Sequence, residues 1–278
     1  MRFDWYQATV PENPVVLVEA LLAKLAPDGS IEEGPGRHNY RQSFTVRDRD
    51  RERVALVLAG GPNGDPNVTA SGGACDAFVP ALRAEWSAHR VTRADVAEDF
   101  AAEGAYEALE RCCRAVATSA GVKGRSIVPD DPADGRTYYM GSPSSDVRVR
   151  LYDKTAESRR HLPPEAHASI PDHWARLEVQ VRPRKQWKQA AAMLDARHFW
   201  GFSGWTTDLA AQALKLDVER ITMQAGRESD HDRAVRFMIQ QYGPTFLRLL
   251  EDHGDWQSVG LQIGHLLIEQ RGRRRMSA

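Results

Sequence analysis

The chain has 278 residues, of which 42% are hydrophobic and 27% charged, and its formal net charge is −1. This length allows one large domain or two ordinary ones, and the composition excludes disordered, collagenous and coiled-coil proteins. The near-zero charge counts against a nucleic-acid-binding protein, because such proteins usually carry a basic excess.

The first half of the chain alternates predicted strands and helices. Periodicity and turn residues predict strands at 3–9, 38–47, 52–58, around 68–69 and 92–100, and helices at 12–25, 74–88 and 106–120. After a polar loop, residues 137–140 and 147–152 are predicted to form a hairpin, and residues 174–181 another strand.

From about residue 184 onward the pattern becomes helical. Helices are predicted at 185–194, 207–216, 230–241, 244–253 and 256–270. Ser229 and Asp255 are expected as helix N-caps, and Gly243 and Gly254 as helix ends. We therefore predict an α+β fold with an antiparallel sheet in residues 1–183 and helices on one of its faces. A helical C-terminal domain should cover 184–270, followed by a disordered basic tail at 271–278.

Two further features concern the cellular location. No apolar run approaches the roughly 20 residues needed to span a bilayer, and the N-terminus lacks the apolar core of a signal peptide. Cys75, Cys112 and Cys113 cannot build a disulfide framework. We expect a cytoplasmic protein with reduced cysteines and no membrane partner.

Polar functional groups gather on one face of several predicted strands, because side chains alternate across a sheet. The side chains assigned to this face are Arg93, Asp95 and Asp99 in one strand, Arg148, Arg150 and Tyr152 in the next, and Arg176, Glu178 and Gln180 in the third. In the first strand, Asp4 and Tyr6 are expected to share a face. A solvated sheet face is the plain alternative, but aspartates are disfavoured in strands and need a reason.

Converging carboxylates favour a bound cation, and hard oxygen ligands suit Mg²⁺ or Mn²⁺. Such ions assist phosphoryl chemistry, and neighbouring arginines suit phosphate. Tyr152 is then a candidate nucleophile, since a nearby cation favours its phenolate. Lys154 could supply that cation or protonate a leaving oxygen.

Successive motifs in this region resemble those of the replication initiation factor family. They are Thr-Arg-Ala-Asp-Val-Ala-Glu-Asp-Phe at 92–100, Thr-Tyr-Tyr-Met-Gly-Ser at 137–142, Arg-Val-Arg-Leu-Tyr-Asp-Lys at 148–154 and Arg-Leu-Glu at 176–178. The family includes rolling-circle initiators of plasmids and filamentous-phage-like elements, and relaxases of some conjugative elements. The resemblance runs from Asp4 to about Val181. Glu98 stands where plasmid members tend to have an apolar or aromatic residue.

The resemblance implies a ferredoxin-like or duplicated, relaxase-like sheet and a metal-dependent DNA nickase in residues 1–183. Tyr152 would attack a phosphodiester at an origin and leave a 5′-phosphotyrosyl link with a free 3′-hydroxyl. Asp95 and Glu178 would hold the metal, with Asp99 and Asp4 as further ligands. Arg150 and Lys154 would hold or neutralise phosphate. Expected partners are origin DNA, a host helicase, a polymerase and a second copy of the chain.

Several alternatives stay open. Tyr138 and Tyr139 lie on the neighbouring hairpin strand, and one of them should face the same side as Tyr152. The segment from Lys185 to Lys188 could contact DNA or form an amphipathic helix. Arg93, Arg148 and Arg176 are further candidates for phosphate contacts. The chain could also be a relaxase for conjugative transfer, or a DNA-binding regulator that does not cut.

The charge is unevenly distributed along the chain. Between residues 136 and 188 there are eleven Lys or Arg and six Asp or Glu, a local excess of 11 − 6 = +5. The overall neutrality therefore does not exclude a DNA-cutting site in this interval.

Overall fold

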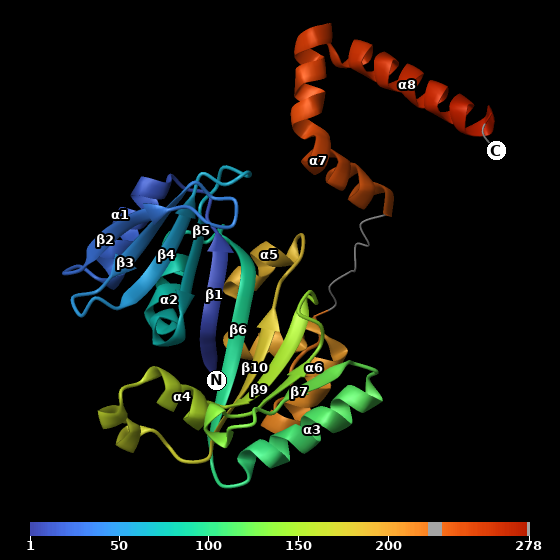
Figure 1. The fold of residues 1–278 in the computed structure, drawn as a ribbon. Helices are drawn as coiled ribbons and strands as arrows, with labels where there is room; N and C mark the ends of the chain where they lie inside the picture. Colours follow the sequence, from blue (N-terminus) through green and yellow to red (C-terminus); the bar gives the residue numbers. More distant parts are fainter. Residues whose placement is uncertain (222–229, 277–278) are drawn as a thin grey trace. The chain divides into compact units, whose positions relative to one another are not determined.

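The computed structural model describes residues 1–221 and 230–276 (Figure 1). The chain divides into two compact units, Met1–Met223 and Gln224–Ala278, and each is described by itself. No helix among the described residues is both long and apolar enough to cross a membrane.

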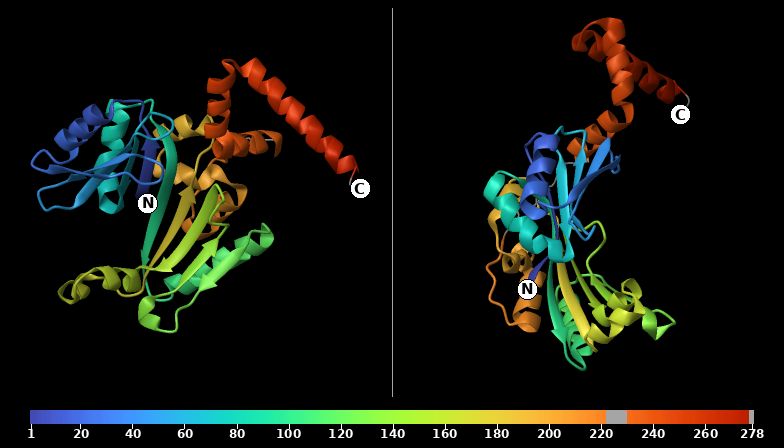
Figure 2. Two further views of the ribbon diagram at one scale, coloured as in Figure 1. Left: turned by 45° about the horizontal axis from the view of Figure 1, so that its top comes forward. Right: turned by 90° about the vertical axis from the view of Figure 1, so that its left-hand side faces the viewer.

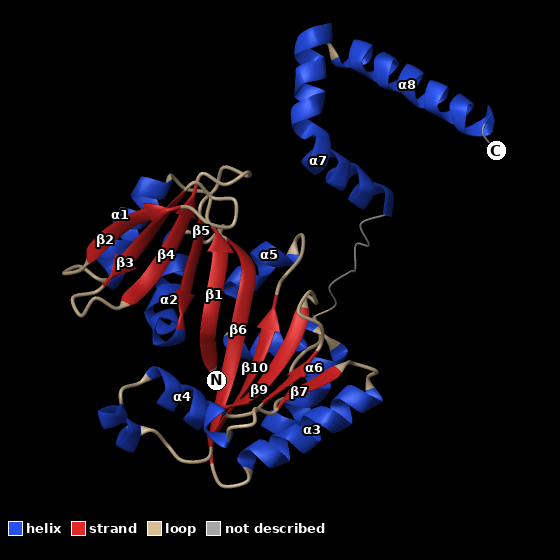
Figure 3. Cartoon of the chain, viewed as in Figure 1, coloured by secondary structure: helices blue, strands red, loops and turns tan. Residues whose placement is uncertain are grey.

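Unit 1 is built on one antiparallel sheet of ten strands, in the order β2-β3-β4-β5-β1-β6-β10-β9-β8-β7 (Figure 3). The strands are β1 (Arg2–Thr9), β2 (Ser30–Pro35), β3 (Gln42–Arg47), β4 (Arg53–Ala59), β5 (Asn67–Ser71), β6 (Arg90–Ala101), β7 (Gly124–Ile127), β8 (Thr137–Met140), β9 (Val147–Asp153) and β10 (Trp174–Val181). The predicted α+β fold with an antiparallel sheet is confirmed.

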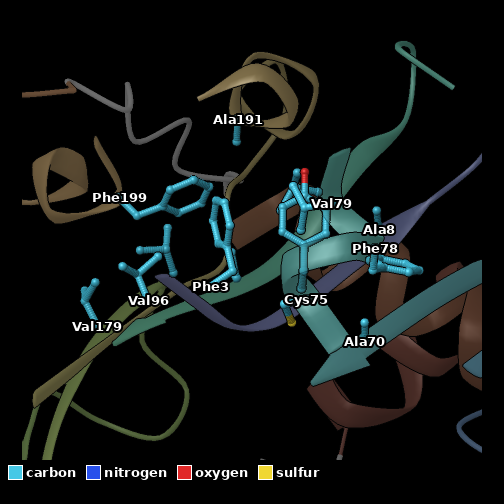
Figure 4. Close-up of a cluster of buried hydrophobic side chains, with 14 of the residues drawn as sticks. Phe3, Ala8, Ala70, Cys75, Phe78, Val79, Val96, Val179, Ala191 and Phe199 are labelled. Carbon is cyan, nitrogen blue, oxygen red and sulfur yellow. The ribbon is translucent and has the colours of Figure 1, made fainter. Parts of the chain in front are cut away.

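Helices cover one face of this sheet. They are α1 (Pro14–Leu25), α2 (Cys75–Glu85), α3 (Ala105–Ser119), α5 (Trp187–Ala190) and α6 (Gly204–Leu209), with short 3₁₀ turns between α5 and α6. Phe3, Val96 and Val179 lie there near Phe199, and Ala8 and Ala70 lie near Phe78 of α2, all in one continuous core (Figure 4). The opposite face, here called the open face, carries the polar side chains of the central strands.

The first strand does not follow the predicted alternation. The pairing of β1 with β6 shifts between Phe3 and Trp5, so Asp4 is an extra residue in a β-bulge. Phe3 and Tyr6 therefore both enter the core, with ring centroids 5.2 Å apart, and Asp4 and Trp5 both belong to the open face. The expectation that Asp4 and Tyr6 share a face was wrong because of this bulge.

The predicted boundary at residue 183 differs from the structure. Residues after β10 stay with the sheet: Phe199 and Trp200 are fully buried, and Phe199 contacts Phe3 of β1 edge to face at 5.3 Å. These aromatic side chains complete the core over β1, β6 and β10. Unit 1 therefore extends about forty residues beyond the expected sheet domain.

Unit 2 contains two helices, α7 (Asp230–His253) and α8 (Trp256–Met276). Gly243 does not end a helix, since α7 continues through Pro244. Gly254 does end it, with a φ of 82° that favours glycine, and Asp255 caps α8 through the backbone N–H of Ser258 at 2.9 Å. The expected tail is helical as far as Met276, and Ser229 lies outside the described residues.

Three elements were not predicted. The edge strands β2 and β7 are short, and all four residues of β7 are exposed, so neither shows clear alternation. Helix α4 (Lys154–His161) follows β9 directly. It lies on the other side of the sheet from α1 and α2, at one end of the open face (Figure 2).

Candidate active site

Strand β9 places Tyr152 on the open face, opposite Arg176 of β10 and Thr137 of β8. The residue is only 5% exposed, and the guanidinium carbon of Arg150 lies 4.3 Å from the centroid of its ring. Burial raises the pKa of Tyr152 and the nearby Glu178 raises it further, whereas Arg150 opposes this shift. The phenol is therefore neutral near pH 7, and its activation requires additional positive charge.

Glu178 is, like Asp95, an almost fully buried carboxylate of this region. It pairs across the sheet with Arg150 of β9 and Ala97 of β6, and Arg150 Nη2 donates to Glu178 Oε2 at 2.8 Å. Burial raises the pKa of Glu178 to about 7; Arg150 works against this, and the charge of Asp95 adds to it. Glu178 therefore changes protonation close to neutral pH.

Arg176 joins two carboxylates from different strands. Its Nε and Nη2 donate to Asp99 Oδ1 and Oδ2 at 2.7 and 2.9 Å, and its Nη1 donates to Asp4 Oδ1 at 2.8 Å. Trp174 Nε1 also donates to Asp99 Oδ1 at 2.8 Å. Burial alone would raise the pKa of Asp99, but the hydrogen bonds and charge of Arg176 outweigh it, so the pKa lies below its usual value.

Asp95 forms a second arginine pair, this time within β6. Arg93 binds both of its oxygens, with Nε donating to Oδ1 at 2.8 Å and Nη2 to Oδ2. Gln180 of β10 donates to Oδ2 at 3.4 Å. The guanidinium carbon of Arg93 also lies 4.8 Å from the centroid of the Trp5 ring, which connects this pair to β1.

Lys154 stands at the junction of β9 and α4. Asp153 caps the helix, its side chain accepting a hydrogen bond from the backbone N–H of Ala156 at 2.9 Å. This cap makes Lys154 the first residue of α4 and holds its Nζ 5.8 Å from the ring centroid of Tyr152 and 5.7 Å from that of Trp174. Lys154 is also paired with Glu157.

A small cavity of about 100 Å³ opens beside these groups. Its lining residues are Arg93, Tyr139, Arg148, Val149, Arg150, Glu178 and Gln180. The Nε atoms of Arg148 and Arg150 are buried, and neither has a hydrogen-bond partner within the part of the chain that the structure describes. Buried donors of this kind are normally satisfied, so the cavity offers three guanidinium groups to an anion such as phosphate.

Most of the predicted site residues therefore lie together on the open face. These are Asp4, Arg93, Asp95, Asp99, Arg148, Arg150, Tyr152, Lys154, Arg176 and Glu178. Lys185 and Lys188 follow the end of β10, and Lys188 lines a neighbouring hollow together with Arg93. Of the two rival tyrosines, Tyr139 faces the site, with Arg148 3.9 Å from its ring centroid, and Tyr138 is buried.

Two aromatic residues of the site were missed. Trp174 donates to Asp99, and Trp5 stacks with Arg93. The alternation of β10 would have placed Trp174 two residues before Arg176 on the same face. No such signal exists for Trp5, because the bulge at Asp4 reverses the pattern there.

The carboxylates fit a divalent cation unequally. In the described ranges, no three acidic, His or Cys side chains converge as a ligand group, and both oxygens of Asp99 are bound by Arg176. Asp95 and Glu178 lie on the neighbouring strands β6 and β10, two residues apart in register, and both are almost fully buried. Oxygen donors in this setting suit Mg²⁺ or Mn²⁺, but Arg93 binds both oxygens of Asp95 and Arg150 binds one oxygen of Glu178, so an ion here would replace arginine contacts.

The fold and the open face define an antiparallel α+β protein with tyrosine, arginine and carboxylate side chains at the centre of its sheet. A scan against protein-family models finds no match, and a search of curated proteins also finds none. Among solved structures, the chain is similar to a rolling circle replication initiator protein from Geobacillus stearothermophilus, with a TM-score of 0.50 and 21% sequence identity.

This similarity covers 82% of the present chain and 88% of the initiator's chain. It therefore concerns the overall architecture rather than a single motif. The resemblance drawn from the sequence motifs is confirmed at the level of the fold.

Proposed function

We propose that this protein starts rolling-circle DNA replication by nicking one strand at an origin. Two findings support the proposal: the fold is similar to that of a rolling circle replication initiator, and Tyr152 lies beside an arginine-lined cavity on the open face. The second observation supports the chemistry, because the phenol of Tyr152 adjoins Arg150, which lines a cavity large enough for a phosphate group.

The proposed reaction is a transesterification at phosphorus. The Tyr152 oxygen bonds to the phosphorus, the phenolic proton is lost to solvent, and the bond from phosphorus to the 3′ oxygen breaks. Lys154 is suited to give the 3′ oxygen its proton. The products are a 5′-phosphotyrosyl link and a free 3′-hydroxyl. The energy of the broken phosphodiester bond is conserved in the phosphotyrosyl bond, so the DNA ends can later be rejoined.

The neighbouring residues have distinct tasks in this proposal. Arg93, Arg148 and Arg150 would orient the phosphate in the cavity. Asp95 and Glu178 would hold Mg²⁺ or Mn²⁺, which neutralises phosphate oxygens and favours the phenolate. Arg176 would keep Asp4 and Asp99 in place without touching DNA.

The test is a covalent adduct assay. Full-length protein with Mn²⁺ is incubated with a pool of single-stranded oligonucleotides. Their sequences tile the DNA molecule that carries the gene for this protein. Covalent adducts are detected by denaturing electrophoresis. We expect an adduct with wild type and a loss of at least 10³-fold with Tyr152→Phe, because phenylalanine has no nucleophile.

Tyr139→Phe is the matched control, since Tyr139 faces the same cavity and should retain the adduct. A Tyr152→Phe variant that forms adducts normally would refute the assignment. Binding without any adduct in wild type would favour the non-cutting regulator instead.

A further inference from the structure

A second, larger hollow lies on the N-terminal half of the open face, and the nicking chemistry does not use it. Its volume is about 610 Å³. The residues that line it, here called the N-terminal groove, are Trp5, Gln7, Thr9, Arg37, His38, Tyr40, Arg53, Leu56, Leu58, Asn63, Asn67, Thr69, Thr92, Arg93, Arg182 and Lys188.

The floor of this groove is built from four neighbouring strands. Leu56 and Leu58 of β4 are buried, but they lie outside the main core and alternate with Ala55 and Val57, which belong to it. Asn67 of β5 accepts a hydrogen bond from Gln7 Nε2 at 2.7 Å. The floor thus combines apolar surface with fixed amide groups and has no charge of its own.

The walls are strongly basic. Five of the lining residues are Arg or Lys, and none is Asp or Glu. Arg93 is bound to Asp95, but Arg37, Arg53, Arg182 and Lys188 make no ion pair with the carboxylates of residues 1–221 and 230–276. Cations gathered without counter-charges create a positive potential that attracts a polyanion.

Two aromatic side chains line the groove together with these cations. Tyr40 lies directly against Gly61, where an added Cβ would come within 2.5 Å of its ring, so the glycine allows this close approach. Trp5 stacks with Arg93, and its buried Nε1 has no hydrogen-bond partner among the described residues. Aromatic faces between cations are the features with which proteins bind unpaired bases.

The groove adjoins the small cavity of the candidate active site. Arg93 lines both the N-terminal groove and the smaller cavity of Arg148, Arg150 and Glu178. A strand whose phosphate lies in the small cavity can therefore extend along the sheet into the groove. A recessed, partly apolar floor receives single bases, whereas a duplex would keep its bases stacked and paired.

We propose that the N-terminal groove binds single-stranded DNA adjoining the nick site, with Arg37, Arg53, Arg182 and Lys188 on its phosphates and Trp5 and Tyr40 beside its bases. The position of the nick rests on the proposed function. The binding itself does not, since it needs neither Tyr152 nor a metal ion.

The experiment measures binding of a fluorescent twelve-residue oligo-dT to the full chain by anisotropy, in EDTA. Arg37→Gln/Arg53→Gln should weaken binding at least tenfold and reduce the slope of log K against log salt by about 1.4, or roughly 0.7 per lost phosphate contact. The control is Arg49→Gln/Arg51→Gln, which removes two exposed arginines of the β3–β4 turn outside the groove.

Thermal melts establish that both double variants fold. Unchanged affinity in Arg37→Gln/Arg53→Gln, or an equal loss in the control, would overturn the proposal. Equal or tighter binding of a blunt duplex that depends on the same two arginines would show that the groove is a duplex site instead.

The two proposals fail separately. Tyr152→Phe should bind oligo-dT as wild type does, even though it forms no adduct. If wild type never forms an adduct but the groove variants still lose oligo-dT, the groove proposal stands without the nicking proposal.

Discussion

Several charged side chains of the open face are buried, and their pKa values depend on burial and on the charges beside them. Glu178 and Arg176 are both nearly inaccessible, at 4% and 2% exposure. Arg176 has two carboxylates around it, whereas Glu178 has one arginine and two acidic neighbours. Burial raises the pKa of Glu178 and its acidic neighbours add to this shift, whereas at Asp99 the hydrogen bonds and charge of Arg176 outweigh burial and lower the pKa.

Glu178 gives the protein a stability that depends on pH. Its pKa is about 7 in the folded protein, compared with the ordinary value of 4.5 expected for the unfolded chain. The folded state therefore binds the proton more tightly than the unfolded state. The stabilisation is fully present below about pH 4.5 and is lost as pH rises through 7. We expect Glu178 to make the protein about 1–3 kcal/mol less stable at pH 8 than at pH 5.

Urea unfolding of wild type and Glu178→Gln at the two pH values measures this effect. The variant should lose most of the difference, because glutamine does not titrate. Asp99 does not contribute to this difference, since its lowered pKa keeps it ionised at both pH 5 and pH 8. An identical pH dependence in the two proteins would contradict the assignment of the shift to Glu178.

At the scale of elements, alternation predicted the central strands well and the periphery poorly. Strands β6, β9 and β10 carry mainly apolar side chains on one face and polar side chains on the other, so alternation separates the two sets, with Glu98 of β6 as the exception. Strand β7 is exposed throughout and α4 has few apolar residues, so neither leaves a periodic signal. The groove could not be predicted, because its walls combine residues of β4, β6, α5 and loops that are distant in sequence.

The ion pairs of Arg176 hold β1, β6 and β10 together on the open face. Truncation by Arg176→Ala would leave Asp4 and Asp99 without their main partner, and removing one member of a fully buried pair typically costs about 3–5 kcal/mol. Because the two carboxylates are 18% and 34% exposed, we expect a smaller loss of about 2–3 kcal/mol in the free energy of unfolding.

Arg159→Ala is the matched control for this loss. Arg159 pairs with Asp172 at an exposed position, where truncation should change the free energy of unfolding by no more than about 0.5–1 kcal/mol. Equal losses in the two variants would show that the strands do not depend on Arg176.

At the scale of the whole molecule, the division into two units differs from the predicted domains. Turn residues and a change to helical periodicity put the boundary at 183, but Phe199 and Trp200 beyond it are fully buried in unit 1. Helical periodicity shows that a segment is a helix and does not show which core it joins. The domain boundary therefore cannot be located without knowledge of the tertiary contacts.

This division predicts that residues 1–223 fold on their own. All ten strands, the core and both hollows of the open face are contained in unit 1. The fragment should keep the melting temperature of the sheet within a few degrees, and calorimetry with near-ultraviolet circular dichroism would measure this. A fragment that ends at 183 should fail to fold, because it lacks Phe199 and Trp200. A folded 1–183 fragment would instead support the domain boundary predicted from the sequence.

The bulge in β1 has a consequence for single-residue deletions. Without Asp4, the remaining sequence Arg-Phe-Trp-Tyr-Gln-Ala alternates regularly between the open face and the core, in step with the partners of β6. Losing Asp4 would shorten the strand without reversing any other side chain. Losing Gln7 instead would bring Ala8 out of step with β6. In a deletion scan of β1, position 4 should therefore be the most permissive for folding, even though it carries a carboxylate of the site.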